Sequence, residues 1–208
     1  MPVNRARIAV FVSGGGTNLQ ALIDAEKAGA IPSGEIVLVV SNNKNAFALQ
    51  RAQAAGIPAQ TVTRRECGSQ EVFEESLVRL LEEYEIDLII LAGFLSILSA
   101  EFTRRFENRI INIHPSLIPS FCGKGYYGLK VHQEALARGV KVTGATVHIV
   151  NEIPDGGRIL LQKAVDILPE DTAETLQRRV MEQAEWILLP QAAEQVSAEI
   201  IKEKERAT

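Results

Sequence analysis

The sequence predicts a doubly wound α/β protein with a mostly parallel sheet, and three observations support that fold class. Short β-branched and aliphatic runs alternate with longer segments of helical periodicity. The run 87–93 (DLIILAG) is apolar at almost every position, which is typical of a strand covered on both faces. A glycine-rich turn at 13–16 follows the first expected strand and opens the first helix. Together they predict a Rossmann-like sheet with helices on both faces.

The first half of the chain supplies strands and helices in alternation. Its expected strands are 7–12, 35–42, 58–62, 87–93 and 109–114. Its expected helices are 18–29, 46–56, 69–85 and 94–106. Gly29 and Gly56 are expected to end the first two helices, because glycine tolerates the left-handed conformation that follows a helix.

The second half departs from this rhythm after residue 114. The segment 115–128 holds two prolines and three glycines and is expected to be a long functional loop, followed by a helix over 129–139. Strands 141–151 and 158–167 are joined by a short connection, which predicts an antiparallel pair. The C-terminal helix is expected to start near Thr172, with Asp171 and Glu174 as a capping box, and Pro190 to kink or split it.

Composition excludes several classes of protein. The 208 residues suffice for about one domain, and the net charge of −4 argues against a general nucleic-acid binder. No run approaches the roughly 20 apolar residues of a membrane span, and the N-terminus is typical of a first strand and not of a signal peptide. Cys67 and Cys122 form no CxxC pair, which favours a reducing cytoplasmic location without disulfides or zinc.

The stretch SGGGTNLQ (13–20) is the first candidate binding element. Backbone N–H groups in such a turn, with the helix dipole, suit a phosphate. It lacks the third glycine of GxGxxG and the lysine of GxxxxGK[ST], so a monophosphate ester is favoured over a dinucleotide or nucleoside triphosphate. A turn that only lets strand and helix pack is the alternative, and the polar Thr17 and Asn18 favour a ligand.

Asn112 and His114 end the run RIINIH, where Pro115 stops the strand. Residues i and i+2 share a face, so both side chains are expected to project together from the carboxyl edge of the sheet, where α/β proteins bind ligands. An amide that donates to an oxyanion and an imidazole that moves a proton suit acyl-type transfer. We expect His132, in a helix, and His148, in a strand, to be structural.

Asp155, in the stretch EIPDGG, is the carboxylate that the sequence offers to His114. An ordinary turn residue of a D-G hairpin is the simpler interpretation of Asp155. A partner that raises the pKa of the imidazole is the alternative. The histidines are too scattered for an HxH or HxxxH pair, so the sequence predicts no metal site.

Four stretches together resemble phosphoribosylglycinamide formyltransferases, the glycinamide ribonucleotide branch of the folate-dependent formyltransferase family. They are SGGGTNLQ, LAGFLSILS (91–99), INIHPSLIPSFCGKG and VNEIPDGG, and the resemblance extends over about 7–190. The N-x-H-P-S-L-x-P core marks the wider 10-formyltetrahydrofolate transferases, and the SGxGTNL turn marks the branch. The resemblance implies transfer of a formyl group from 10-formyltetrahydrofolate to the glycyl amine of glycinamide ribonucleotide in purine biosynthesis. It implies direct attack by the amine, without a metal.

The resemblance also assigns residues to roles. The implied catalytic residues are Asn112, His114 and Asp155. The implied phosphate-binding residues are Gly16, Thr17, Asn18, Leu19 and Gln20. The implied folate-binding residues are Leu95, Ser96, Ile97, Leu98, Asn112, Asn151, Glu152, Ile153, Pro154 and Asp155.

Further implications concern the C-terminal helix and the whole chain. Glu185, five residues before Pro190 as in the family pattern, would contact the substrate, although RRVMEQAEW is one residue longer here. Gln70 and Ser96 stand where the family often has basic residues that hold the folate tail. One domain over 1–208 is implied, with a phosphate-binding half (1–115) and a half (116–208) that carries the folate-site loops. We expect a cytoplasmic monomer or homodimer that binds only small molecules.

Three other functions remain open from the sequence. Methionyl-tRNA formyltransferases are longer and carry an arginine-glycine pair where this chain has SFCGKGYYG. Formyltetrahydrofolate deformylases normally have an N-terminal regulatory domain and lack the GTNL turn. A nucleotide-binding regulatory module would explain residues 14–18 but would leave Asn112, His114 and Asp155 without a purpose.

Overall fold

The computed structural model describes residues 5–207, which form two compact units, 5–98 with 193–207 and 99–192. The predicted single domain includes residues 1–4 and 208, which lie outside the described residues. Its division into halves at 115/116 stays a prediction. No helix within 5–207 combines the length and the apolar character needed to span a membrane.

The first unit is built on four parallel strands in the order β3-β2-β1-β4. Their bounds are β1 (Ala6–Val12), β2 (Gly34–Ser41), β3 (Ala59–Thr61) and β4 (Leu88–Leu91). All four residues of β4 and all but one of β1 are buried, as expected for strands covered on both faces. The predicted parallel arrangement is therefore confirmed for these strands.

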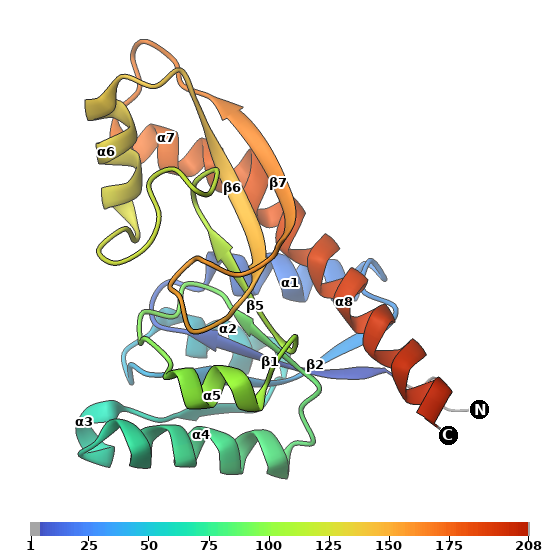
Figure 1. Ribbon diagram of the computed structural model, residues 1–208. Helices are drawn as coiled ribbons and strands as arrows, with labels where there is room; N and C mark the ends of the chain where they lie inside the picture. The colour runs from blue at the N-terminus through green and yellow to red at the C-terminus, as the bar shows by residue number, and fades with distance from the viewer. Residues whose placement is uncertain (1–4, 208) are drawn as a thin grey trace. The chain divides into compact units, whose positions relative to one another are not determined.

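Helices cover both faces of these strands. They are α1 (Thr17–Lys27), α2 (Phe47–Ala55), α3 (Arg64–Cys67), α4 (Gln70–Glu83) and residues 193–207 of α8 (Trp186–Ala207). Figure 1 shows α1 and α2 on one side of the strands and α4 on the other. Gly56 follows α2 in the left-handed conformation (φ 73°), as predicted. The short α3 was not predicted; the Thr63 side chain caps it by accepting from the Glu66 N–H.

The second unit contains three antiparallel strands in the order β5-β6-β7. They are β5 (Ile110–His114), β6 (Val142–Ile149) and β7 (Ile159–Asp166), and β6 and β7 form the long hairpin seen in Figure 1. The helices of this unit are α5 (Ala100–Arg105), α6 (Leu129–Arg138), α7 (Ala173–Val180), the π-helical turn η1 (Met181–Glu185) and the start of α8. The predicted antiparallel pair is confirmed, and β5 is antiparallel to β6 as well.

Two predicted helix boundaries are wrong. The predicted helix 94–106 is helical only over α5, because the Ser99 side chain caps a helix that begins at residue 100. The predicted capping box of Asp171 and Glu174 lies one residue further on, at Thr172 and Thr175. Asp171 instead accepts hydrogen bonds from two guanidinium nitrogens of Arg179, and these bonds lower its pKa to about 2.

Pro190 was predicted to kink or split the C-terminal helix, and the split is wrong. α8 continues from Trp186 through Pro190 to Ala207, and the irregular turn lies upstream, at η1. A proline ring crowds the carbonyl four residues earlier, which here belongs to Trp186, at the junction of the π turn with the α-helix. A π turn adds one residue to a helix without ending it. The position of η1 is compatible with the one residue by which RRVMEQAEW is expected to exceed the family pattern.

Candidate active site

Asn112 and His114 lie on β5, and the strand register places His148 opposite Asn112 and Thr146 opposite His114. Residues i and i+2 share a face with the residues opposite them, so these four polar side chains project together. His114 is 4% exposed and His148 2%. Buried polar groups need hydrogen-bonding partners, and two loops of the second unit supply them.

The first partner is Asp155, in the loop between β6 and β7. Its Oδ2 lies 3.6 Å from His114 Nδ1, and its Oδ1 lies 3.6 Å from His148 Nε2. Oδ2 also accepts a hydrogen bond of 2.7 Å from the Gly123 N–H. The simpler interpretation of Asp155, an ordinary hairpin turn residue, is therefore wrong, and the structure brings Asn112, His114 and Asp155 together.

The D-G-G turn gives this loop its shape. Asp155 has a left-handed backbone (φ 55°), a conformation that costs energy for a residue with a side chain. At Gly157 an added Cβ would lie only 1.7 Å from the Ile149 carbonyl oxygen, so only glycine lets the loop approach the end of β6 so closely. The strained Asp155 is thus held by its neighbours and presents its carboxylate to the two imidazoles.

His148 has a part in this cluster that the sequence did not indicate. Its Nδ1 lies 2.9 Å from the Ile149 carbonyl oxygen, which can only accept, so Nδ1 carries the hydrogen. In the neutral ring Nε2 then accepts from Asn112 Nδ2, 3.1 Å away. This contact orients the amide of Asn112 and leaves the second amide hydrogen for another acceptor. The strand pattern around His148 predicted a structural residue, because its pairing with Asn112 depends on the register of β5 and β6.

The 115–128 loop covers the second nitrogen of His114. Thr146 anchors the start of the loop, since its hydroxyl donates to the Ser116 carbonyl (2.6 Å) and accepts from the Ile118 N–H (3.1 Å). Further along, the Phe121 carbonyl lies 2.9 Å from His114 Nε2. A carbonyl and a carboxylate therefore face the two ring nitrogens, an arrangement that favours the imidazolium form.

Burial and charge act in opposite directions on these groups. Burial lowers the pKa of His114 below its ordinary value, although the Asp155 charge and the Phe121 carbonyl both raise it. Burial alone would raise the pKa of Asp155, but His148 when its Nε2 carries a hydrogen, the His114 ring and the Gly123 N–H outweigh burial, and the pKa is lowered. Asp155 is therefore ionised, and its charge raises the pKa of His114 as predicted, but desolvation is larger and the net shift is downward.

In the first unit, the predicted phosphate turn joins β1 to α1. Gly16 is left-handed (φ 72°), and an added Cβ there would lie 2.6 Å from Ala48 Cβ, so no other residue fits. Asn18 is 8% exposed, and the side chain of Leu19 is wholly buried in the core. Leu19 can therefore offer a ligand only its backbone.

Arg51 of α2 is a second residue that sequence analysis missed. Its Nε donates to the Gly15 carbonyl (2.9 Å) and its Nη1 to Gln20 Oε1 (3.1 Å). The guanidinium also lies over the Phe47 ring, 5.0 Å from its centroid. A fixed positive charge thus lies beside the glycine turn. The helical pattern of 46–56 gave no signal for it, because α2 meets the turn only in the folded chain.

The predicted folate segment 95–98 also lies in the first unit. Leu95 and Ile97 are 61% and 66% exposed, unusual for large apolar side chains. The Leu95 N–H donates to Ser13 Oγ (2.8 Å), and Gln70 Nε2 donates to the Ile97 carbonyl (3.1 Å). Asn42 Nδ2 donates to Ser96 Oγ (2.6 Å). Gln70 and Ser96 therefore hold this segment in place.

Comparison with known proteins identifies the family. The formyl transferase model matches residues 6–192. The chain belongs to the formyl transferase family. A phosphoribosylglycinamide formyltransferase of Haemophilus influenzae is 44% identical over 177 residues, which are 85% of this chain and 81% of that protein. The solved phosphoribosylglycinamide formyltransferase of Brucella melitensis is 44% identical with a TM-score of 0.86, over 94% of this chain and 97% of that one.

The chain also matches one part of much longer proteins. The trifunctional purine biosynthetic protein adenosine-3 of Gallus gallus is 45% identical over 195 residues. Those residues are 94% of this chain but only 19% of that protein. The chain therefore corresponds to one section of this multifunctional relative.

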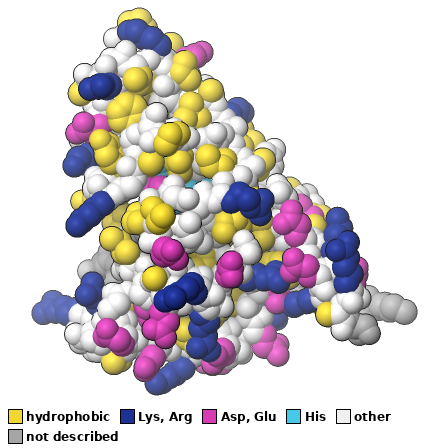
Figure 2. All heavy atoms as spheres, in the orientation of Figure 1, with side chains coloured by type: hydrophobic (Ala, Val, Ile, Leu, Met, Phe, Trp, Pro, Cys, Tyr) yellow, Lys and Arg dark blue, Asp and Glu magenta, His cyan; other side chains and the backbone are white. Residues whose placement is uncertain are grey.

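The remaining residues that sequence analysis assigned lie in the second unit. Ile153, in the 151–155 segment, is 59% exposed, and Figure 2 shows hydrophobic side chains gathered on the visible face over α6, β6 and β7. Glu185, the last residue of η1, is 6% exposed. Its role stays a prediction. Within 5–207, no group of three or more His, Cys, Asp or Glu side chains could hold a metal ion.

Proposed function

We propose that this protein transfers the formyl group of 10-formyltetrahydrofolate to the glycyl amine of glycinamide ribonucleotide. The observation that carries the proposal is the cluster of Asn112, His114 and Asp155, with Asp155 Oδ2 3.6 Å from His114 Nδ1. An amide donor beside a buried histidine-carboxylate pair suits an acyl transfer that passes through an oxyanion. The two relatives named phosphoribosylglycinamide formyltransferase support the acceptor and the transfer of a formyl group.

In this proposal the amine attacks the formyl carbon, and the formyl oxygen gains negative charge. Asn112 Nδ2 has two hydrogens, and His148 Nε2 accepts one of them. The other hydrogen donates to the formyl oxygen. His114 supplies a second donor and moves the proton between the amine and the leaving nitrogen through Nε2, once this nitrogen exchanges the Phe121 carbonyl for the substrate. The Asp155 carboxylate orients the imidazole and raises its pKa, against the larger effect of burial.

The substrate phosphate is assigned to the turn over Gly16–Gln20, with Arg51 as an added positive charge. Backbone N–H groups at the start of α1 and a guanidinium suit a phosphate monoester. Glu185 is assigned to the substrate as well. With the phosphate at this turn, residues 1–115 are proposed as the phosphate-binding half and residues 116–208 as the half with the folate-site loops.

The folate donor is assigned to the segments 95–98 and 151–155 and to Asn112. The exposed side chains of Leu95, Ile97 and Ile153 fit an aromatic ring system, since apolar surface left in water favours a partner that covers it. Bound there, 10-formyltetrahydrofolate supplies the activated formyl group. Gln70 and Ser96 are uncharged, so we expect a weak hold on the anionic folate tail. A cytoplasmic location and a monomeric or homodimeric state remain predictions.

One assay separates this function from its nearest rival. The purified protein is incubated with 10-formyltetrahydrofolate, with and without glycinamide ribonucleotide, and release of the formyl group is followed. Loss only in the presence of the acceptor supports transfer. Equal loss without the acceptor would show a deformylase and would refute the proposal.

A further inference from the structure

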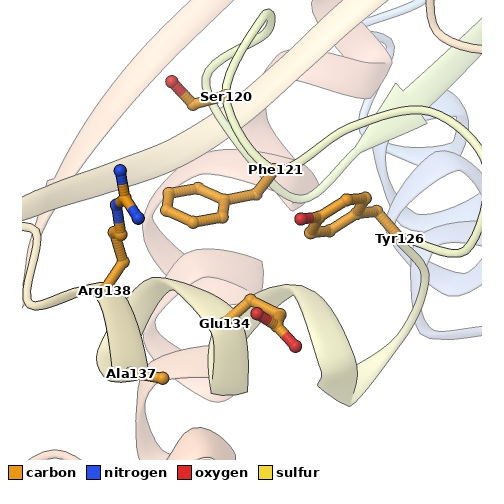
Figure 3. Close-up of a pocket in the computed structure, with 6 residues that line it drawn as sticks. All are labelled: Ser120, Phe121, Tyr126, Glu134, Ala137 and Arg138. Atoms are coloured by element: carbon orange, nitrogen blue, oxygen red, sulfur yellow. The ribbon is translucent and has the colours of Figure 1, made fainter.

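A pocket with a volume of about 510 Å³ lies in the second unit, between the 115–128 loop and α6 (Figure 3). Its lining residues are Ser120, Phe121, Tyr126, Glu134, Ala137 and Arg138. None of them is assigned to catalysis, to the phosphate or to the folate. A volume between roughly 300 and 1,000 Å³ is the usual range of small-molecule sites.

The pocket combines an aromatic wall with hydroxyl groups. Phe121 and Tyr126 pack edge to face, with ring centroids 6.4 Å apart, and both rings lie above α6 in Figure 3. A flat aromatic ligand can pack against such a pair through its face or its edge. Ser120 and the Tyr126 hydroxyl add hydrogen-bonding groups at the rim.

The pocket also carries two opposite charges that do not neutralise each other. Glu134 and Arg138 lie one turn apart on α6 with the acid first, the order that favours an i,i+4 ion pair. Glu75 and Arg79 have the same spacing and do form such a pair. Within residues 5–207, neither the Glu134 carboxylate nor the Arg138 guanidinium is in a hydrogen bond or an ion pair. In Figure 3 the Arg138 side chain rises from the helix beside the Phe121 ring, and the Glu134 side chain lies on the helix surface below the rings, so both are available to a ligand.

Phe121 links this pocket to the catalytic histidine. Its side chain lines the pocket, while its carbonyl lies 2.9 Å from His114 Nε2. Its backbone is left-handed (φ 48°), a conformation that persists only where the surroundings hold it. Because the same residue faces both sides, a molecule that fixes Phe121 in this position also keeps His114 Nε2 engaged with the carbonyl.

We propose that this pocket binds a small planar aromatic molecule with an anionic group at one end and a cationic group at the other. Arg138 and Ser120 bind the anionic end, Glu134 and the Tyr126 hydroxyl bind the cationic end, and the ring packs on Phe121. Occupancy holds Phe121 against His114 and withholds Nε2 from proton transfer. The effect on the rate rests on the proposed formyl transfer, whereas the binding itself does not.

Three probes that share one ring test the charge pattern on the full-length protein. They are 4-(aminomethyl)benzoate, which has both charges, 4-methylbenzoate, which has only the anion, and 4-methylbenzylamine, which has only the cation. Calorimetric titration should give a Kd of about 1 mM for the first, as for other ligands of this size, and about fivefold weaker binding for each of the others. Equal affinity for all three probes would overturn the proposal.

Variants of the lining residues locate the site. Arg138→Gln and Glu134→Gln should each weaken binding of 4-(aminomethyl)benzoate about fivefold, whereas Arg178→Gln, an exposed arginine of α7 outside the pocket, should leave it unchanged. Unchanged affinity in both pocket variants, with unchanged melting temperatures, would also overturn it. In the transferase assay, saturating probe should lower kcat about fivefold and leave both KM values unchanged. Charge-dependent binding with an unaltered kcat would overturn the link to His114.

Discussion

Replacing Asp155 by Asn should remove the charge that faces His114 while the loop keeps its shape. Asparagine tolerates the left-handed backbone at this position, and its amide oxygen can still accept the Gly123 N–H. What is lost is the attraction between a carboxylate and an imidazolium whose atoms lie 3.6 Å apart. Two unit charges about 4 Å apart attract by roughly 4 kcal/mol at an effective dielectric constant of about 20.

Asp155 is shared with His148 and partly solvated, so about half of that attraction, roughly 2 to 3 kcal/mol, is the expected loss. A factor of ten corresponds to about 1.4 kcal/mol, so the imidazolium population at neutral pH should fall about 30- to 100-fold. If protonated His114 is the group that acts, kcat should fall by the same factor. The KM for glycinamide ribonucleotide should change little, because Asp155 is assigned to the imidazole and not to the phosphate.

The test is the dependence of kcat on pH, measured for both proteins between about pH 5 and pH 9. Burial already lowers the pKa of His114, and loss of the carboxylate lowers it further. The decline of kcat with rising pH should therefore begin at a lower pH in Asp155→Asn. Asp166→Asn, which removes an exposed carboxylate of β7, is the control and should match the wild type. A profile for Asp155→Asn that superimposes on the wild type would refute the reasoning.

Three further predictions concern other parts of the molecule. Arg51→Gln should raise the KM for glycinamide ribonucleotide about tenfold and leave kcat unchanged, because one charge-assisted contact with a phosphate is lost; steady-state kinetics would contradict this if kcat alone fell. His148→Phe should lower kcat about 100-fold, as the amide of Asn112 loses its orientation, and an unchanged kcat would exclude that role. The pKa of His132 is lowered to about 4 by burial and by the His114 charge, so the unfolded chain alone binds a proton between about pH 6.5 and pH 4. Stability should fall as the pH falls through that window, and His132→Leu should remove up to about 3 kcal/mol of this dependence, which urea unfolding at pH 7 and pH 4.5 would measure.

Local sequence patterns predicted most of the helices and strands. The apolar run at 87–93, the glycines after α1 and α2 and the short connection before residue 158 each depend on neighbours in sequence, and each predicted its element correctly. The errors occurred where a side-chain cap or a neighbouring segment decided the boundary. Ser99 begins α5 later than periodicity suggests, and the irregular turn near Pro190 lies before α8, at η1.

Part of the candidate site was also visible in the sequence. Asn112 and His114 are two residues apart on a strand, so period-two geometry alone put them on one face. Asp155 was ambiguous, because a D-G turn has the same letters whether or not its carboxylate meets an imidazole. His148 and Arg51 were missed for the same reason. Each acts through a partner that only strand pairing or helix packing brings near.

The sequence by itself determined the class of fold, the strand end with its amide and imidazole, and the glycine turn, since each depends on residues a few positions apart. The tertiary structure decided which of two interpretations held for Asp155, how Asn112 is oriented and which groups face His114. Those contacts join β5, β6 and two loops, and the distance between such segments depends on strand register and on the path of the 115–128 loop. The tertiary structure also decided the direction of the pKa shift of His114. Burial, which no local sequence pattern indicates, outweighs the charge of Asp155.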